Sequence, residues 1–338
     1  MDESYTGFAE VYDELMDNVP YEEWAEFLVS VLREYGVGAG RSGRQHGAKD
    51  AAVLPQDAGD TVLESSLQRK GAEGTGGETL QDETENADTG QVRDNVKGEA
   101  EHTGVSENSS AELAENLAAE RNTVLDLGCG TGTLTELLCR AGFDMIGIDN
   151  SEEMLEIALQ KREKNGSDIL YLLQDMREFE LYGTVGAACS VCDSLNYILE
   201  EEDMVKVFSL VNNYLYPGGI FVFDFNTVYK YEQVIGDDTI AENRDDCSFI
   251  WENYYDEESR INEYDLTIFV RKPDTEYFRK FTETHYQKGY TLEQMKGFLE
   301  AAGLLFVKAF DADTRGEVRV ESERIYVIAR ERGKQAET

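Results

Sequence analysis

The chain has 338 residues, of which 31 are Lys or Arg and 69 are Asp or Glu, so its formal net charge at pH 7 is −38. Nucleic-acid binding depends on clustered basic side chains that neutralise phosphates, and this composition argues against such a partner. The five cysteines are scattered, the acidic start lacks the pattern of a signal peptide, and no run of 18 apolar residues occurs. We therefore expect a cytoplasmic protein with reduced thiols and no membrane contact.

The first predicted element is a helix in "YEEWAEFLVSVLREY", residues 21–35. Its apolar residues recur at helical spacing, which indicates one buried face. We assign residues 1–36 to an N-terminal cap segment and helix of the main domain. Tyr12, in the segment before this helix, is expected to close over a bound ligand.

A long segment without aromatic residues follows, from Gly36 to Gly142, although aromatics make up 10% of the chain. Within it, residues 37–120 contain 7 basic and 17 acidic residues and are rich in Gly, Ser and Thr. Such a composition buries too little apolar surface to offset the entropy of ordering the chain. We predict a disordered acidic insertion over 37–120 within a single α/β domain.

Strands and helices then alternate through residues 121–247 and resume over 288–332. Buried-strand runs such as "NTVLDL" and "FDMIGID" are followed by helical segments such as "TLTELLCRAG" and "SEEMLEIALQKRE". The alternation predicts a Rossmann-like, seven-stranded, mostly parallel sheet with helices on both faces. Ligands of such sheets bind at the carboxyl ends of the strands. Residues 333–338 are read as a tail.

The alternation of strands and helices stops between residues 248 and 287, where strand-like segments are joined by short connections such as "DEES" and "KPDT". Hairpins of this kind predict a small antiparallel sheet. We expect it to act as a cap that roofs the ligand crevice.

The glycines of "LDLGCGTGTL" mark the end of the first strand of the core. A dinucleotide fingerprint would need a third glycine where Thr133 stands, and the Lys of a phosphate-binding P-loop is absent. Asp126 precedes Gly128, Gly130 and Gly132, and its carboxylate suits a cationic amino group better than a pyrophosphate. Asp149 follows Gly128 by 21 positions, the interval expected of an acid that binds ribose hydroxyls.

These residues resemble class I S-adenosylmethionine-dependent methyltransferases. "VLDLGCGTG" and "IGIDNSEEML" are similar to the first two motifs of that family and "LLQDMREFEL" to the third, while "YTGFAEVYDELM" and "CDSLNYIL" are similar to a bacterial branch that acts on small molecules. The resemblance implies that Asp126 approaches the methionine amino group, Asp149 binds the ribose and Asp175 the adenine amino group, beside the backbone of Met176. The full set predicted to bind the cofactor is Tyr12, Asp126, Gly128, Cys129, Gly130, Gly132, Asp149, Asn150, Asp175 and Met176.

The implied reaction moves a methyl group from S-adenosylmethionine to an O or N atom of a small soluble metabolite by in-line displacement. Alignment alone can lower the barrier by roughly 7–11 kcal/mol, so no protein nucleophile is needed. Asp193 and Asn196, after the fourth strand, are the first candidates for acceptor contacts, and His285 is a candidate base. A magnesium site at Asp193 and Asp224 is a less favoured alternative, and we predict no metal.

Three other functions stay open on the sequence alone. They are a methyltransferase acting on RNA or protein, a protein that binds the cofactor without turnover, and a nucleotide-cofactor oxidoreductase. The oligomeric state is not indicated by any feature of the sequence.

Overall fold

The structure is a computed structural model that describes residues 8–17, 19–38 and 118–334. Most of the predicted disordered insertion over 37–120 lies outside these ranges. At its edges, Val37 is buried after helix α2 (Tyr21–Glu34), and residues 118–122 are helical. The folded core therefore extends a few residues into the predicted insertion at each of its two ends.

Seven strands form the larger sheet, in the order β10-β11-β5-β4-β1-β2-β3. They are β1 (Thr123–Leu127), β2 (Asp144–Asp149), β3 (Leu170–Leu173), β4 (Val185–Ser190), β5 (Leu215–Asn226), β10 (Leu304–Asp311) and β11 (Arg324–Glu331). Strands β1 to β5 are parallel to one another, whereas β11 pairs antiparallel with both β5 and β10. The predicted mostly parallel, seven-stranded sheet is confirmed.

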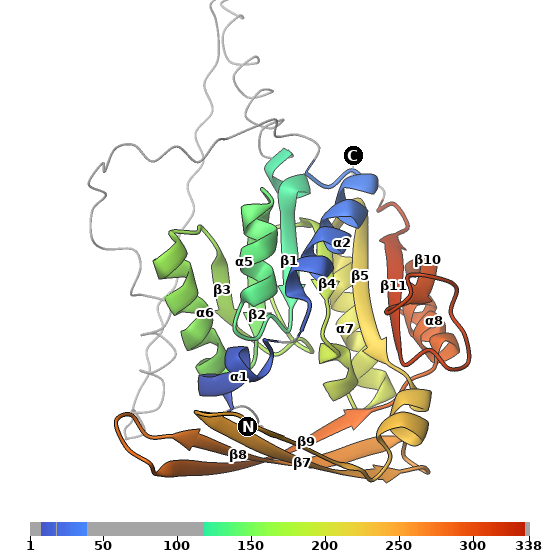
Figure 1. Cartoon of the computed structure of the whole chain (residues 1–338). Coiled ribbons are helices and arrows are strands. Elements are labelled where there is room, and N and C mark those ends of the chain that lie inside the picture. Colours follow the sequence, from blue (N-terminus) through green and yellow to red (C-terminus); the bar gives the residue numbers. More distant parts are fainter. Residues whose placement is uncertain (1–7, 18, 39–117, 335–338) are drawn as a thin grey trace, which may run out of the picture. The chain divides into compact units, whose positions relative to one another are not determined.

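Helices cover both faces of this sheet (Figure 1). Helices α2, α5 (Thr133–Arg140) and α6 (Glu152–Asn165) pack on one face, and α7 (Glu201–Tyr214) and α8 (Leu292–Ala301) pack on the other. Strand β5 serves both cores, because alternate side chains point to opposite faces: Val222 joins one apolar cluster, and Phe221 and Phe223 join the other. Among the described residues, no helix combines the length and apolar character needed to cross a bilayer.

Four strands form a separate antiparallel sheet in the order β6-β7-β8-β9, which confirms the predicted small antiparallel sheet. None of its residues is in the lining of the pocket described below, so its role as a roof stays a prediction. They are β6 (Thr239–Asn243), β7 (Cys247–Asp256), β8 (Ile261–Arg271) and β9 (Phe278–Lys288). Strand β6 has no counterpart among the elements predicted from the sequence, because its residues are mostly exposed and show no apolar alternation. Short helix α1 (Ala9–Leu15) packs on this sheet through Val11 and Leu15.

Candidate active site

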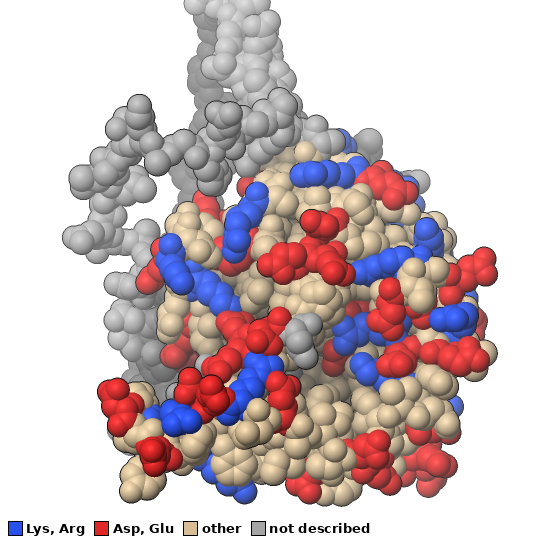
Figure 2. All heavy atoms as spheres, viewed as in Figure 1, with Lys and Arg blue, Asp and Glu red and all other residues tan. Residues whose placement is uncertain are grey.

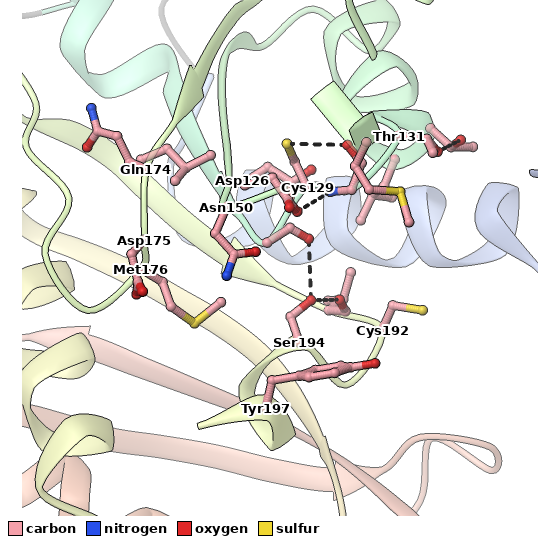
Figure 3. A pocket seen from close by; sticks show the side chains of 18 of the residues that line it. Asp126, Cys129, Thr131, Asn150, Gln174, Asp175, Met176, Cys192, Ser194 and Tyr197 are labelled. Carbon is pink, nitrogen blue, oxygen red and sulfur yellow. Dashed lines mark hydrogen bonds between the residues drawn. The ribbon is translucent and has the colours of Figure 1, made fainter. Parts of the chain in front are cut away.

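The main pocket in the described part of the chain lies at the carboxyl ends of β1 to β4 (Figure 3). The strand order reverses between β1 and β4, the point at which open α/β sheets bind ligands. The lining residues used below are Tyr12, Tyr21, Asp126, Gly128, Cys129, Gly130, Asp149, Asn150, Asp175, Met176, Cys192, Ser194 and Tyr197. Nine of the ten residues predicted to bind the cofactor are in this set, and the exception is Gly132.

The glycine loop adopts a left-handed backbone at Gly128, Gly130 and Gly132, with φ of 78°, 53° and 72°. A Cβ at Gly128 would lie 2.7 Å from the Cβ of Ser194, and one at Gly132 would collide with the hydroxyl of Tyr171. At Gly130 a Cβ would meet no atom within 4 Å. The loop therefore packs tightly at its two ends and presents open main chain to the pocket at its centre. This corrects the expectation for Gly132, which provides close packing and not space for a ligand.

Asp126, on β1, is a buried acid at the floor of the pocket, with 3% of its surface exposed. Its carboxylate accepts hydrogen bonds from the hydroxyl of Thr135, at 2.6 Å, and from the thiol of Cys189, at 3.7 Å. Burial raises the pKa of this carboxyl to about 6, and the two hydrogen bonds oppose the rise. A cation bound beside it would favour the ionised form.

Asp149 ends β2 and connects the glycine loop to helix α6. Its Oδ2 accepts from the backbone N–H of Gly130, at 2.7 Å, and its Oδ1 accepts from that of Ser151, at 3.0 Å. Burial raises the pKa of this carboxyl, although both backbone bonds lower it. Each carboxylate oxygen has two lone pairs, so both oxygens retain one acceptor position for ligand hydroxyls.

The far side of the pocket is formed by the turns after β2 and β3. Asn150, Asp175 and Met176 line this side. Cys129, which belongs to the glycine loop, lines the opposite side (Figure 3). Asp175 forms a paired contact with Arg177, with Nε–Oδ1 and Nη2–Oδ2 distances of 2.9 and 2.5 Å. Partial burial raises the pKa of Asp175, but the bonds to Arg177 outweigh it, so the net pKa is lowered. This acid is an anionic acceptor at neutral pH.

Tyr12 lines the pocket from helix α1, as predicted. The adjacent Asp13 fixes the helix to the glycine loop, because its Oδ1 accepts from the hydroxyls of Thr131 and Thr133, at 2.7 and 3.1 Å. Lys161 of α6 completes this cluster with an ion pair of 2.6 Å to Asp13. The sequence analysis did not anticipate these contacts.

Asp193 does not line the pocket, although its neighbours Cys192 and Ser194 do. Cys192 and Asp193 have left-handed backbones, and their N–H groups donate to the two carboxylate oxygens of Asp224, at 3.1 and 2.9 Å. The Asp193 side chain bonds Arg324, at 2.8 Å, and Gln287, at 2.7 Å. We therefore no longer propose Asp193 as an acceptor contact.

The magnesium alternative has little support, because a guanidinium lies between the two acids. Arg324 contacts Asp193 at 2.8 Å and Asp224 at 3.6 Å. In the described ranges no group of three His, Cys, Asp or Glu side chains is arranged to hold a metal ion.

Asn196 is fully buried and connects three segments of the backbone. Its amide nitrogen donates to the carbonyls of Asn226 and Lys288, at 2.9 and 2.7 Å, and its oxygen accepts from the N–H of Asn226, at 2.9 Å. The side chain joins the turn after β4 to the ends of β5 and β9. It is not part of the pocket lining, so we do not propose it as an acceptor contact.

His285 lies on β9 and is 1% exposed, so it does not reach the pocket directly. Its Nδ1 is 3.3 Å from the hydroxyl of Tyr197, which does line the pocket, and its ring stacks on Tyr264 with centroids 4.8 Å apart. Tyr197 immediately follows Asn196 in the same turn, and it lines the pocket whereas Asn196 does not.

The residues around the pocket fit S-adenosylmethionine. Asp126 offers a buried anion to an ammonium group, Gly130 offers bare main chain, and Asp149 retains acceptor positions for ribose hydroxyls. Asn150, Asp175 and Met176 provide polar and apolar contacts on the side expected for the adenine. The assignment of each residue to a part of the cofactor stays a prediction.

Comparisons with known proteins agree with this site. Residues 124–219 match the family model described as "Methyltransferase domain". The chain is 35% identical over 211 residues to the Bacillus subtilis protein named "Putative methyltransferase YqeM", a match covering 62% of this chain and 84% of that protein. The crystal structure of an S-adenosylmethionine-dependent methyltransferase from Clostridium acetobutylicum is 30% identical with a TM-score of 0.58, and the match covers 67% of this chain and 92% of that one.

A shorter stretch of the chain is similar to an enzyme whose name states its substrate. Over 114 residues it is 31% identical to dTDP-3-amino-3,4,6-trideoxy-alpha-D-glucopyranose N,N-dimethyltransferase of Streptomyces venezuelae, covering 34% of this chain and 46% of that enzyme. The long matches, the fold and the glycine-loop pocket agree on one family. The chain belongs to the class I S-adenosylmethionine-dependent methyltransferases, and S-adenosylmethionine is its cofactor.

Proposed function

We propose that this enzyme transfers the methyl group of S-adenosylmethionine to an O or N atom of a small soluble metabolite. The observation that carries the proposal is a mainly aromatic part of the pocket lining. Besides Tyr12, which is also predicted to contact the cofactor, it includes Tyr21, Cys192 and Tyr197, and these residues come from helices α1 and α2 and from the turn after β4. A pocket of apolar surface with a few polar groups is typical of small-molecule sites.

The chemistry requires alignment more than it requires acid catalysis. When bound, the cofactor supplies an electrophilic methyl group on a sulfonium, whose departure leaves a neutral thioether. The enzyme has to orient the acceptor atom opposite that bond and exclude water. Helix α1, fixed by Asp13 to the glycine loop and packed on the antiparallel sheet through Val11 and Leu15, contributes Tyr12 to this side of the pocket.

RNA and protein acceptors are less well supported. The net charge of −38 opposes nucleic-acid binding, and on the face shown in Figure 2, Lys and Arg side chains are interspersed with Asp and Glu and do not form one basic patch. The named substrate of the Streptomyces relative is a nucleotide-linked amino sugar, which supports a small acceptor with an amino or hydroxyl group. Family membership argues against the oxidoreductase and against a protein without turnover.

The test is to incubate the purified chain with methyl-labelled S-adenosylmethionine and a fractionated cell extract. We expect label in material that passes a small-molecule filter and resists nuclease and protease, and mass spectrometry would identify the product. The Asp149→Ala variant serves as the control with impaired cofactor binding. Label found only in nuclease-sensitive or protease-sensitive material would contradict the proposal.

A further inference from the structure

The part of the pocket proposed for the acceptor is lined by aromatic rings. Its residues are Tyr12, Tyr21, Cys192 and Tyr197, which we call the acceptor wall. Figure 3 shows the ring of Tyr197 nearly edge-on beneath Ser194, with one face turned toward the other labelled lining residues. The face of an aromatic ring carries partial negative charge and attracts a cation that lies within about 6 Å of the ring centroid.

Two rings of the acceptor wall are held in place by other aromatic side chains. Tyr12 packs edge-to-face against Phe8, with centroids 5.1 Å apart, and Tyr21 packs in the same way against Trp24, at 5.6 Å. Rings fixed before a ligand arrives lose little side-chain entropy when it binds. The wall is therefore suited to recognising a ligand with its ring faces.

The charged groups of the pocket lining are three acids and one arginine. The acids are Asp126, Asp149 and Asp175. Arg177 is paired with Asp175 at 2.5 Å and contacts Asp203 at 3.7 Å. Among the described residues, the lining contains no Lys, no His and no second Arg. A phosphate or carboxylate group on the acceptor would therefore meet an excess of acids.

The charges behind the acceptor wall are also mainly negative. Asp193 and Asp224 share one guanidinium, that of Arg324, at 2.8 and 3.6 Å. Burial raises the pKa of the Cys192 thiol to about 12, and Asp193 adds more to this rise than Arg324 removes. Burial also raises the pKa of Tyr21, and Asp193 contributes to the rise. Cys192 and Tyr21 therefore stay protonated at neutral pH, in surroundings that favour a cation.

We propose that the acceptor is a primary or secondary amine without phosphate or carboxylate groups, recognised as a cation by the acceptor wall. The inference rests on the proposed function and narrows the methylated atom from O or N to N. The named substrate of the Streptomyces relative also carries an amino group. Its nucleotide diphosphate, in contrast, would find no unpaired cation in the described lining of this pocket.

An amine suits this pocket because the transfer moves a positive charge without removing it. The ammonium form of the acceptor releases its proton to water, and the lone pair of the free amine attacks the methyl carbon. The nitrogen–carbon bond forms as the carbon–sulfur bond breaks, and the electron pair of the broken bond stays on sulfur. The positive charge passes from sulfur to the nitrogen of the product, where the tyrosine rings and nearby acids stabilise it.

A hydroxyl acceptor has a different requirement. Its proton has to pass to a base during the transfer, because the methylated oxygen would otherwise carry a positive charge. The three acids of the lining are assigned to the cofactor, and the described lining contains no imidazole. The thiol of Cys192 and the hydroxyl of Tyr21 are protonated at neutral pH and do not serve as bases.

The first test asks whether the methyl group goes to an amine. The small-molecule filtrate of a cell extract is acetylated, which converts primary and secondary amines to amides, and then treated with hydroxylamine to cleave esters formed on hydroxyl groups. The matched control filtrate receives the same reagent after hydrolysis. We expect acetylation to abolish the transfer of label from methyl-labelled S-adenosylmethionine. Equal labelling of the two filtrates would overturn the amine and leave the proposed function intact.

Ion exchange of the untreated filtrate at pH 7 tests the charge of the acceptor. We expect a cation exchanger to remove the material that becomes labelled, and an anion exchanger to let it pass. Removal by the anion exchanger would overturn the exclusion of phosphate and carboxylate groups, whichever atom is methylated.

A third test needs no acceptor. Choline, the alcohol in which carbon replaces its nitrogen, and the carboxylate of the same shape carry a positive, a zero and a negative charge. Their binding to the protein saturated with S-adenosylhomocysteine is measured by ligand-detected NMR. We expect choline to bind about tenfold more tightly than the alcohol, as cation–π contacts of this kind provide, and the carboxylate to bind more weakly than either.

Variants of Tyr21 assign this preference to the acceptor wall. Tyr21→Phe keeps the ring and should keep the preference, whereas Tyr21→Leu should reduce it. Tyr182→Leu is the matched control, because Tyr182 is fully exposed. The Kd of S-adenosylhomocysteine in each variant shows that the cofactor site is intact.

Equal binding of choline and the alcohol by the wild type would overturn the inference even if the enzyme methylates a metabolite. A preference for choline without any labelled small molecule would show instead that the proposed function is wrong and that the pocket still recognises a cation.

Discussion

The carboxylate of Asp13 accepts a 2.7 Å hydrogen bond from the hydroxyl of Thr131, which lies 118 residues later in the chain. This contact joins helix α1 to the glycine loop, on the two sides of the undescribed segment 39–117. Lys161 reinforces it, because its ammonium bonds Thr131 at 3.0 Å as well as pairing with Asp13. The helix that carries Tyr12 is thus fixed to the glycine loop, which we expect to contact the cofactor.

Replacing Asp13 with Ala should accelerate cofactor release. The substitution removes two hydrogen bonds and a partly exposed ion pair between α1 and the loop, which together are worth about 1 kcal/mol. We expect the dissociation rate of S-adenosylhomocysteine, measured by stopped flow, to rise roughly fivefold. The matched control is Asp17→Ala, because Asp17 pairs with Arg244 and not with the loop. Equal rates in the two variants would show that α1 does not retain the cofactor.

Gly130→Ala and Gly132→Ala should separate cofactor binding from folding. Both positions have positive φ, which costs a non-glycine residue about 1–2 kcal/mol. Only at Gly132 does the added methyl also collide with Tyr171 and reach within 3.0 Å of Ala158, so this variant should have the lower Tm. Gly130→Ala should keep more stability but lose cofactor affinity, since its methyl enters the open part of the pocket. Calorimetry and thermal melts would check both, and an unchanged Kd for Gly130→Ala would contradict the assignment.

Cofactor affinity should depend on pH through Asp126. Burial raises its pKa to about 6, above the ordinary value of 3.8, so in the free folded enzyme it binds a proton more tightly than in the unfolded chain. This group alone therefore makes the free fold more stable as pH falls from about 6 toward 4. The ammonium of the cofactor requires the ionised form, so the affinity should fall as pH falls through about 6.

For one group with a pKa of about 6, the affinity should fall about fivefold from pH 6 to pH 5 and approach the limit of about tenfold per pH unit below pH 5. Titrations at several pH values, in buffers of different ionisation enthalpy, would measure both the affinity and the proton released. Asp126→Asn should bind more weakly at pH 7 and lose this slope. A slope that persists in Asp126→Asn would assign the titration to another acid, with Asp149 the first candidate because its pKa is also raised.

Much of the cofactor side of the site could be predicted from sequence because its geometry is local. Asp126 and Asp149 lie at the carboxyl ends of strands that are recognisable as apolar runs, and parallel strands bring these ends together. The glycines of the loop have positive φ values that few other residues adopt, so they mark the turn directly.

The acceptor side depends on contacts between distant segments, and the residues expected there from the sequence, Asp193 and Asn196, do not line the pocket. The Asp193 side chain leaves the pocket because Asp224, 31 residues later, holds the backbone of Cys192 and Asp193 in a left-handed turn. Nothing within "CDSLNY" reveals that interaction. The hydroxyl of Tyr197 lies 3.3 Å from Nδ1 of His285, which is 88 residues away in the sequence.

Strand β9 carries a sequence pattern that indicates a polar inward face. Glu283, His285 and Gln287 alternate along the strand and are all buried, whereas Thr284 and Tyr286 between them are exposed. Three polar side chains on the inward face of a strand contradict the usual pattern of apolar inward residues. Such a conflict between local pattern and burial is expected at functional sites.

The ion cluster at Arg324 gives a prediction about stability. Its guanidinium is 17% exposed and contacts Asp193 at 2.8 Å and the fully buried Asp224 at 3.6 Å. Removing the cation with Arg324→Ala leaves a buried carboxylate without its charge partner, which typically costs about 3–5 kcal/mol. We expect the free energy of unfolding, measured by urea denaturation at pH 7, to fall by an amount in this range.

The comparison variant is Arg177→Ala. Arg177 also contacts two acids, Asp175 and Asp203, but its side chain is 47% exposed, and exposed ion pairs contribute about 0–1 kcal/mol. Lowering the pH from 7 toward the ordinary range of carboxyl groups should partly rescue Arg324→Ala relative to the wild type, because burial raises the pKa of Asp224 and its protonation removes the unpaired charge. If both arginine variants lost equal stability, and acid gave no relative rescue of Arg324→Ala, burial of Asp224 would not be the source of the energy. The turn that carries Cys192 and Tyr197 would then have to be stabilised mainly by Asn196, whose three backbone hydrogen bonds do not depend on charge.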